Sequence, residues 1–292
     1  MNDRNCVLVT GARGFVGRHL VRYLATQGFK VVAASRSAGA HEDPNVTVVQ
    51  LPDLSAPIDW KPLLQGCDAV VHLAGVAHKV VGDDVYDRIN HQATAELAQA
   101  TLSCGVTHLV FVSSIAAQSG SSSKRELTEG DSPAPVNAYG KSKLAGEQAV
   151  RAAGVSFTIL RPVVIYGEGE KGNFATIHKI ARLPLPLPFG ALAAKRSVLS
   201  ISNFNSAVRT ALTNPRARGE TFIVSDPTPI NVADLIARHR ASLGRPRWLI
   251  SIPERWLERS LKTVGQGAVW ERLGRPLVAR PCKLLKIGWK PS

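Results

Sequence analysis

Short apolar segments alternate with longer segments of helical periodicity along the first 165 residues of the chain. Brief apolar runs bounded by polar or glycine-rich stretches predict buried strands. The predicted strands are Cys6–Thr10, Lys30–Ser35, Val46–Gln50, Ala69–Leu73, Leu109–Ser113 and Ser156–Leu160, and the main predicted helices are Phe15–Gln27, Asp84–Ser103 and Ala138–Ala153. Because strands that alternate with helices are typical of βαβ units, we expect an α/β fold with a doubly wound parallel sheet.

The regular alternation ends after Arg161-Pro162, where glycine- and proline-rich connections begin. A chain of 292 residues suits one large unit or two closely packed domains. We therefore expect residues 1–165 to form a first domain, to which residues 198–224 return. Residues 166–197 and 225–292 are expected to form a smaller C-terminal domain.

A glycine-rich turn follows the first predicted strand and opens the first helix, with the sequence Thr-Gly-Ala-Arg-Gly-Phe-Val-Gly at residues 10–17. Gly11 permits a tight turn, Gly14 permits backbone N–H groups to approach a pyrophosphate, and Gly17 permits close packing of helix on strand. The helix N-terminus, at Phe15 and Val16, adds the positive end of a dipole. The alternative is a glycine-rich turn without a ligand, but its place between strand and helix favours a Rossmann-like dinucleotide site.

The end of the second strand indicates which dinucleotide is bound. A carboxylate there would hold a ribose 2′-hydroxyl, whereas an arginine would accommodate a 2′-phosphate. The strand ends in Ala33-Ala34-Ser35-Arg36-Ser37, without an acidic residue. Ser35 and Arg36 therefore predict a preference for NADP(H), with NAD(H) as the open alternative. Arg36 could also be an ordinary solvated surface charge.

Tyr139 and Lys143 lie four positions apart on a predicted helix and therefore share one face. A phenol is a poor acid or base near neutral pH, and a neighbouring ammonium would lower its pKa. We expect Tyr139 to exchange a proton and Lys143 to lower the pKa of Tyr139. Ser113 and Ser114 end the fifth strand, where open α/β sheets place their sites, so a serine there could bind a substrate oxygen.

These features, in this order, resemble the extended short-chain dehydrogenase/reductase family, in its nucleotide-sugar epimerase and reductase branch. The resemblance covers nearly the whole chain. It implies that Ser114, Tyr139 and Lys143 are catalytic, with hydride moving between the nicotinamide and a sugar carbon. It also implies a set of cofactor contacts beyond the glycine turn, Ser35 and Arg36, namely Asp53, Leu54, Leu73, Ala74, Gly75, Asn90 and Pro162.

The second part of the chain matches the same family. In Lys195-Arg196-Ser197-Val198, the resemblance implies that Arg196 meets the diphosphate of a UDP- or dTDP-sugar. His78, Ser113 and Asn173 are further expected substrate contacts. The smaller domain is thus expected to bind a nucleotide sugar, and the two long helices resemble those that form a homodimer in the family.

Three functions remain open. Ser113-Ser114 is followed by Ile115-Ala116-Ala117, without the acidic pair of dehydratases, which disfavours dehydration. Reduction of a 4-keto sugar nucleotide in surface-polysaccharide synthesis is favoured, because a 2′-phosphate is of little use to an enzyme that recycles its cofactor in place. A UDP-sugar 4-epimerase with tightly bound nicotinamide is the first alternative. The second is a Rossmann binding or assembly protein without catalytic activity.

Composition adds one unusual feature, a formal net charge of +14 from 36 Lys and Arg against 22 Asp and Glu. From residue 238 onward there are 13 basic and three acidic residues, interleaved with Trp248, Trp256 and aliphatic side chains. No nucleic-acid recognition motif accompanies this charge. A basic amphipathic segment could lie on an anionic membrane, but we favour the interpretation that its apolar face closes the smaller domain.

The cysteines and the N-terminal segment bear on the compartment. Cys6, Cys67, Cys104 and Cys282 form neither a CxxC pair nor a zinc-binding pattern, so we expect reduced thiols and no metal site. The apolar run after Arg4 is too short for a signal peptide. We expect a cytoplasmic protein. Additional peripheral contact with the inner face of the membrane is an alternative that stays open.

Overall fold

Seven parallel strands form the central sheet of the computed structural model, which describes residues 6–292 except 38, 40, 78–80, 170–180 and 264. The strands are β1 (Cys6–Thr10), β2 (Lys30–Ser35), β3 (Val46–Gln50), β4 (Ala69–His72), β5 (His108–Val112), β6 (Phe157–Pro162) and β10 (Glu220–Val224). Their order is β10-β6-β5-β4-β1-β2-β3, and every pair is parallel. The predicted doubly wound parallel sheet is confirmed.

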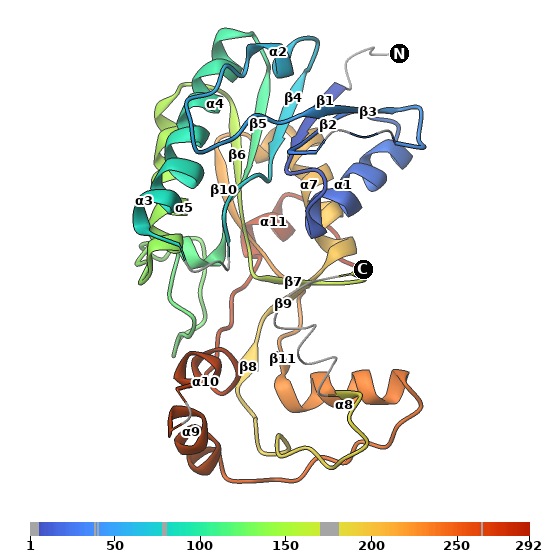
Figure 1. Ribbon diagram of the computed structural model, residues 1–292, viewed down its shortest axis with the longest axis vertical. Helices are drawn as coiled ribbons and strands as arrows, with labels where there is room; N and C mark the ends of the chain where they lie inside the picture. Colours follow the sequence, from blue (N-terminus) through green and yellow to red (C-terminus); the bar gives the residue numbers. More distant parts are fainter. Residues whose placement is uncertain (1–5, 38, 40, 78–80, 170–180, 264) are drawn as a thin grey trace.

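Helices cover both faces of this sheet, as Figure 1 shows. One face carries α1 (Phe15–Thr26), α7 (Ile201–Thr213) and α11 (Cys282–Lys286), which contribute Leu20, Phe204 and Leu284 to one buried apolar cluster. The other face carries α2 (Lys61–Leu64), α4 (Ala93–Ser103) and α5 (Ala138–Ala152) over a second cluster. Strands buried on both faces are mainly apolar. All of β5 is buried, and residues 109–112 are apolar, while His108 is hydrogen-bonded to Ser156 and Thr158.

The predicted helix Asp84–Ser103 is divided in the structure. It consists of α3 (Asp83–Asp87), a π-helical turn η1 (Arg88–Gln92) and α4. A π-turn inserts a residue into the helical pattern and is frequent at functional sites. The inserted turn carries Asn90, whose side chain is buried.

The smaller unit lies at the opposite end of the molecule from β3 and α2 (Figure 1). Its described residues include two short strand pairs and three helices, with a third apolar cluster that contains Trp270. Its elements, with the strand pair that joins it to the first unit, are β7 (Val164–Tyr166), β8 (Lys195–Arg196), β9 (Val198–Ser200), β11 (Ile230–Asn231), α8 (Val232–Ser242), α9 (Glu254–Thr263) and α10 (Gly267–Leu273).

The C-terminal boundary differs from the prediction. The sequence places residues 225–292 in the smaller domain, but Leu277, Leu284 and Trp289 belong to the apolar cluster beside α1 and α7. The indole of Trp289 also donates a hydrogen bond of 2.9 Å to Ser206 of α7. The last residues therefore return to the large sheet, where their apolar side chains fill the space beside β10 and α7.

Among the described residues, no helix combines the length and the apolar character needed to span a bilayer.

Candidate active site

The glycine turn joins β1 to α1 with little space between them. Gly11 has a positive φ of 70°, and its carbonyl accepts a 3.0 Å hydrogen bond from the Gly14 N–H. A Cβ atom on Gly17 would lie 2.2 Å from the Gly11 carbonyl oxygen. The first turn of α1, with Phe15 and Val16, is thereby held against the turn so that the helix N-terminus points to the sheet edge.

A pocket at this edge brings together nine of the 14 predicted cofactor residues. These are Gly11, Gly14, Ser35, Arg36, Asp53, Leu54, Leu73, Ala74 and Gly75. Pro162 ends β6, which β5 separates from β4, and it does not line the pocket. Since β1, β2 and β4 end side by side, residues distant in sequence meet here, as expected for the crevice at the carboxyl edge of an open sheet.

Two polar residues of this pocket were not predicted, Arg13 and Ser37. The Arg13 guanidinium donates a 2.9 Å hydrogen bond to the Ser37 hydroxyl, which joins the glycine turn to the end of β2. The Ser35 hydroxyl is buried and donates to the Ser37 carbonyl at 2.8 Å. Arg13 could have been found from the sequence, because it lies between two glycines whose turn must face the end of the second strand.

Asp53 lies on the same rim as Arg36. Hydrogen bonds from Ser55, and to a smaller extent the charge on Arg36, lower the pKa of the Asp53 carboxyl. The rim therefore presents one carboxylate beside the cations Arg13 and Arg36.

A buried chain of hydrogen bonds supports the floor of the pocket. The Thr10 hydroxyl accepts from the backbone N–H groups of Leu73 and Ala74, at 3.2 and 3.1 Å, and must therefore donate to His72 Nδ1 at 2.8 Å. His72 Nε2 then donates to the Thr94 hydroxyl at 3.2 Å, since Thr94 donates to the Asn90 carbonyl at 2.9 Å. The imidazole must be neutral, and burial lowers the pKa of His72 to about 3.

The Asn90 side chain completes this support. Its amide oxygen accepts from the Val76 N–H at 2.8 Å, and its nitrogen donates to the Val76 carbonyl at 2.9 Å and to Ser142 at 3.1 Å. Asn90 is therefore behind the pocket wall rather than on its surface. Asn90 holds the segment that follows Gly75 through both hydrogen bonds to Val76. Its influence on a bound cofactor would therefore be indirect, through that segment.

The three candidate catalytic residues meet where β5 ends against α5. Ser114 caps a short 3₁₀ turn (Ile115–Ala117), and its hydroxyl accepts from the Ala116 N–H at 3.1 Å. Desolvation raises the pKa of Tyr139 more than its hydrogen bond with Ser114 lowers it. Lys143 Nζ is buried, donates to the Val112 carbonyl at 2.7 Å, and lies 4.6 Å from the centre of the Phe111 ring.

The predicted effect of Lys143 on Tyr139 is not met in this arrangement. We expected Lys143 to lower the pKa of Tyr139, but desolvation of the phenol dominates and raises it. Burial also lowers the pKa of Lys143 to about 8. The phenol is therefore protonated near neutral pH and suited to donate a proton.

The expected substrate residues do not all gather at this site. Ser113 is buried, and its hydroxyl donates to Glu147 at 2.6 Å instead of facing the pocket. Arg196 donates to the carbonyls of Arg275 and Ser121. His78 and Asn173 lie outside the described residues. Ser113 was misplaced because both serines directly follow β5 in extended sequence, and successive side chains of an extended chain point in opposite directions.

No group of three potential ligands that could hold a metal ion is present among the residues described in the structure. The donors that line the pocket are glycine N–H groups, hydroxyls and guanidinium groups, which suit a phosphate-bearing dinucleotide. Residues 7–225 match the family described as NAD dependent epimerase/dehydratase family.

The chain belongs to the NAD-dependent epimerase/dehydratase family.

The relatives of this family member include both epimerases and reductases. The chain is 29% identical over 299 residues to a UDP-glucose 4-epimerase of Vibrio cholerae, covering 98% of this chain and 90% of that protein. It is 30% identical over 268 residues to a 2′-dehydrokanamycin reductase of Streptomyces kanamyceticus, covering 88% and 72%. The expected extended short-chain dehydrogenase/reductase, an NAD-dependent enzyme of the epimerase and reductase kind, is confirmed.

Solved structures agree on the fold. MoeE5 in complex with UDP-glucuronic acid and NAD superposes with a TM-score of 0.76 at 24% identity, covering 98% of this chain and 93% of that one. This likeness confirms the Rossmann-like architecture inferred from the sheet.

The buried neutral histidine makes stability depend on pH. Below a pH of about 6.5 the unfolded chain protonates His72, whereas the folded protein does so only near pH 3. Stability is therefore lost as pH falls between these values, by about 1.4 kcal/mol per unit from His72 alone. Urea unfolding from pH 7.5 to 4.5 should show a shallower loss for His72→Gln. The exposed control His41→Gln should follow the wild type, and equal slopes for all three proteins would refute the assignment.

Proposed function

We propose that the protein reduces the 4-keto group of a UDP- or dTDP-linked sugar with NADPH, in surface-polysaccharide synthesis. The observation that carries the proposal is the phenol of Tyr139, which is hydrogen-bonded to Ser114 and kept protonated by desolvation. It lies one helical turn before Lys143, whose Nζ would be 3.9 Å from a Cβ atom on Gly75 in the pocket wall. A ketone reductase needs a proton donor in this state.

The residues present fit a nicotinamide dinucleotide. The glycine turn and the first turn of α1 would hold the pyrophosphate, while Leu73, Ala74 and Gly75 form the wall toward Lys143. When bound, the nicotinamide would supply the hydride. The Ser114 hydroxyl would orient the keto oxygen, and Tyr139 would transfer its proton to that oxygen as the negative charge develops. Lys143 would stabilise the resulting phenolate.

The polar rim of the pocket supports NADP(H) over NAD(H). Arg13 and Arg36 both line it, and Ser37 lies between the end of β2 and the Arg13 guanidinium. Two guanidinium groups and a hydroxyl suit a 2′-phosphate. They support NADP(H) binding more strongly than a single surface arginine would. Asp53 on the same rim is the feature that favours a ribose hydroxyl, and NAD(H) is therefore the alternative.

A UDP-sugar 4-epimerase is the second candidate, favoured by the likeness to the Vibrio cholerae UDP-glucose 4-epimerase over nearly the whole chain. It would use the same three residues, with the hydride returned to the other face of the sugar. A binding protein without catalytic activity is disfavoured because Tyr139, Lys143 and Ser114 are all present, Tyr139 is hydrogen-bonded to Ser114, and Lys143 lies behind the pocket wall at Gly75.

The smaller unit would bind the nucleotide sugar in this proposal. Arg196 is the candidate for its diphosphate, and it would exchange its backbone carbonyl partners for phosphate oxygens. A homodimer through α4 and α5 stays a prediction from the family resemblance. The four cysteines are all unpaired, which fits the proposed cytoplasmic location.

The reaction is tested by stoichiometry. Purified protein given a UDP-4-keto sugar should oxidise one NADPH per sugar reduced, followed by absorbance and by product analysis. Tyr139→Phe removes the proton donor, so kcat should fall by about 100-fold or more, while the control Tyr23→Phe, at a partly buried position on α1, should not lower it. Conversion without net NADPH loss would indicate epimerisation, and an active Tyr139→Phe would refute the role of the phenol.

Cofactor preference is tested by equilibrium binding. NADPH should bind more tightly than NADH, and Arg13→Gln and Arg36→Gln should each weaken NADPH binding by about tenfold or more, with little effect on NADH. Arg22→Gln, on the exposed side of α1, is the control. Equal or tighter binding of NADH to the wild type would contradict the NADP assignment.

We further propose that the smaller unit contacts an anionic membrane. Six of the ten large apolar side chains most exposed among the described residues lie on it: Leu183, Leu185, Leu243, Trp248, Ile250 and Trp256, between 39 and 57% exposed. Backbone hydrogen bonds of 2.9 and 2.8 Å join Leu187 to Trp248 and Ile250, so the two exposed segments lie side by side.

The buried Arg240 holds this surface in shape. Its guanidinium donates to the carbonyls of Leu183, Leu185 and Pro246, at 3.3, 3.2 and 2.8 Å, and lies 5.9 Å from the Trp248 ring. Trp248 has a φ of 34°, a strained backbone for a large residue that is kept at an exposed position.

The positive charge near these apolar side chains favours an anionic membrane as the partner. Arg182, Arg255 and Arg259 are exposed and form no ion pair with any residue that the structure describes. Arginines beside exposed tryptophan and leucine are the combination that binds the interface of an anionic bilayer.

Vesicle co-sedimentation tests the membrane contact. The protein should pellet with phosphatidylglycerol vesicles at low salt and not with phosphatidylcholine vesicles. Trp248→Ala with Trp256→Ala, or Arg255→Gln with Arg259→Gln, should reduce binding about tenfold or more, whereas Leu102→Ala and Arg22→Gln should not. Absence of binding at low salt would refute the proposal. It would also be refuted if the tryptophan or arginine variants bound vesicles like the wild type but converted a dimer to a monomer in sedimentation, because the exposed face would then be a subunit interface.

A further inference from the structure

A third polar residue follows Tyr139 and Lys143 on the same face of α5. Glu147 lies four residues after Lys143, as Lys143 lies four after Tyr139, so the three side chains succeed one another at single turns of the helix. Glu147 is completely buried. Its carboxylate has no part in the chemistry proposed above, and a buried charge is costly unless it is fully paired.

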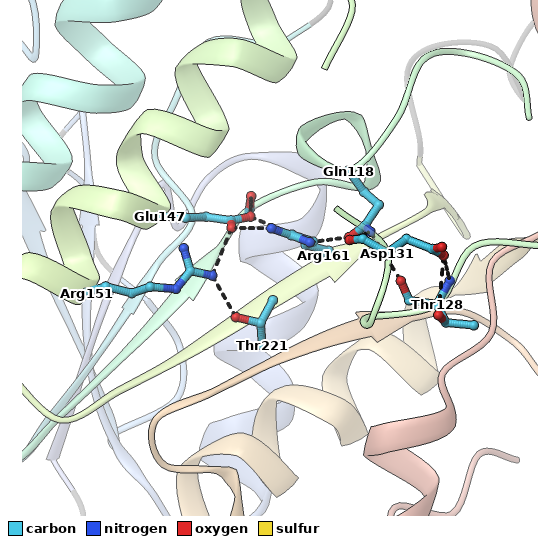
Figure 2. Close-up of polar contacts among 8 residues, drawn as sticks. Gln118, Thr128, Asp131, Glu147, Arg151, Arg161 and Thr221 are labelled. Atoms are coloured by element: carbon cyan, nitrogen blue, oxygen red, sulfur yellow. Dashed lines mark hydrogen bonds and ion pairs between the residues drawn. The ribbon is translucent and has the colours of Figure 1, made fainter. Parts of the chain in front are cut away.

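Four hydrogen bonds saturate this carboxylate. Oε1 accepts from the Ser113 hydroxyl at 2.6 Å and from Arg161 Nε at 2.8 Å. Oε2 accepts from Arg161 Nη2 at 2.6 Å and from Arg151 Nη2 at 3.2 Å. Figure 2 shows the Arg161 guanidinium extending from β6 to Glu147, with Arg151 on the other side of the carboxylate. The bidentate geometry of Arg161 fixes the direction of the Glu147 side chain.

The remaining nitrogen of Arg161 extends the network to the loop after Ser114. Arg161 Nη1 donates to the Gln118 side-chain oxygen, and the Gln118 nitrogen donates to the carbonyls of Thr128 and Asp131 at 3.2 and 2.7 Å (Figure 2). Ser113 immediately precedes Ser114, and Gln118 follows it by one turn. The network therefore holds the chain on both sides of Ser114.

The negative charge of Glu147 also acts on Lys143 in this buried region. The neutral His72 on β4 and the Phe111 ring also face Lys143, and Tyr139 lies one helical turn before it on α5. Tyr86 of α3 packs on Tyr139 at 6.0 Å between ring centres, and the charge of Arg161 is paired with Glu147. Burial lowers the pKa of Lys143 to about 8, and the charge on Glu147 opposes that shift.

We propose that Glu147 is a positioning residue, which keeps Lys143 charged and holds Ser114 against Tyr139 through Ser113, Arg161 and Gln118. The proposal rests on the proposed function only for its effect on turnover. Its electrostatic part concerns the protein alone, because the carboxylate, the lysine and the strand end are all within one buried set of contacts.

The electrostatic part is tested by titration of Lys143 in protein labelled with ¹³C at lysine Cε, with the resonance assigned from Lys143→Met. Glu147→Gln combined with Arg161→Met removes the pair without leaving an unpaired buried charge. The pKa of Lys143 should fall relative to the wild type, because the charge of Glu147 acts on Lys143, whereas loss of the Arg161 charge offsets only part of its removal. Glu220→Gln with Lys283→Met removes an exposed pair of the same charges and should leave the Lys143 titration unchanged.

Turnover tests the positioning part. The Glu147→Gln, Arg161→Met protein should lose about ten- to 100-fold in kcat with a smaller change in KM. As pH rises, its activity should begin to decline at a lower pH than that of the wild type, because Lys143 loses its charge earlier. Glu147→Asp retains the charge but shortens the side chain, so the Lys143 titration should persist while kcat falls. This variant also serves if the double variant does not fold.

Two results would overturn the proposal. One is a Lys143 titration that is unchanged in a folded double variant. The other is a Glu147→Asp enzyme with wild-type kcat. Because the titration needs no substrate, absence of turnover in the wild type would contradict the proposed function and leave the effect on Lys143 measurable.

Discussion

The ammonium group of Lys143, buried between α5 and the end of β5, is the constraint on which the active-site edge depends. A charge in this position is stabilised only if acceptors and negative charge surround it. The Val112 carbonyl, the Phe111 ring and the carboxylate of Glu147 supply them. Val112 and Phe111 belong to β5, and Glu147 belongs to α5. Stabilising the Lys143 charge therefore requires that α5 stay packed on β5.

The same constraint connects the dinucleotide pocket with the proton donor. His72 lies beneath the pocket and near Lys143, and its neutral state follows from burial together with the lysine charge. Its hydrogen bonds join Thr10 of β1 to Thr94 of α4, while Asn90 holds the segment after Gly75. The cofactor wall and the catalytic helix are therefore parts of one polar network, because Asn90 also donates to Ser142 of α5. The reductive chemistry proposed here needs this arrangement, because it leaves the Tyr139 phenol protonated and Lys143 able to stabilise the phenolate.

Local patterns in the sequence predicted the features that depend on neighbouring residues. Continuous apolar runs predicted the strands, and the spacing of Gly11, Gly14 and Gly17 predicted the turn that the structure shows. Features set by contacts between distant segments were not predictable in this way. The π-turn that carries Asn90 has no local signal. The pairing of Ser113 with Glu147 joins a strand end to a helix 34 residues later. The return of residues 277–292 to the large sheet was missed because Leu277, Leu284 and Trp289 are apolar in either location.

The central claim is that hydride from NADPH reaches C4 of a keto sugar nucleotide while Tyr139 supplies the proton. The most direct measurement uses NADPH carrying deuterium at nicotinamide C4, on the transferred face, with a UDP-4-keto sugar, and locates the label in the product by NMR. The account predicts one deuterium at C4 of the sugar for each NADPH oxidised. A product without deuterium at C4, or conversion that leaves the labelled NADPH intact, would contradict it.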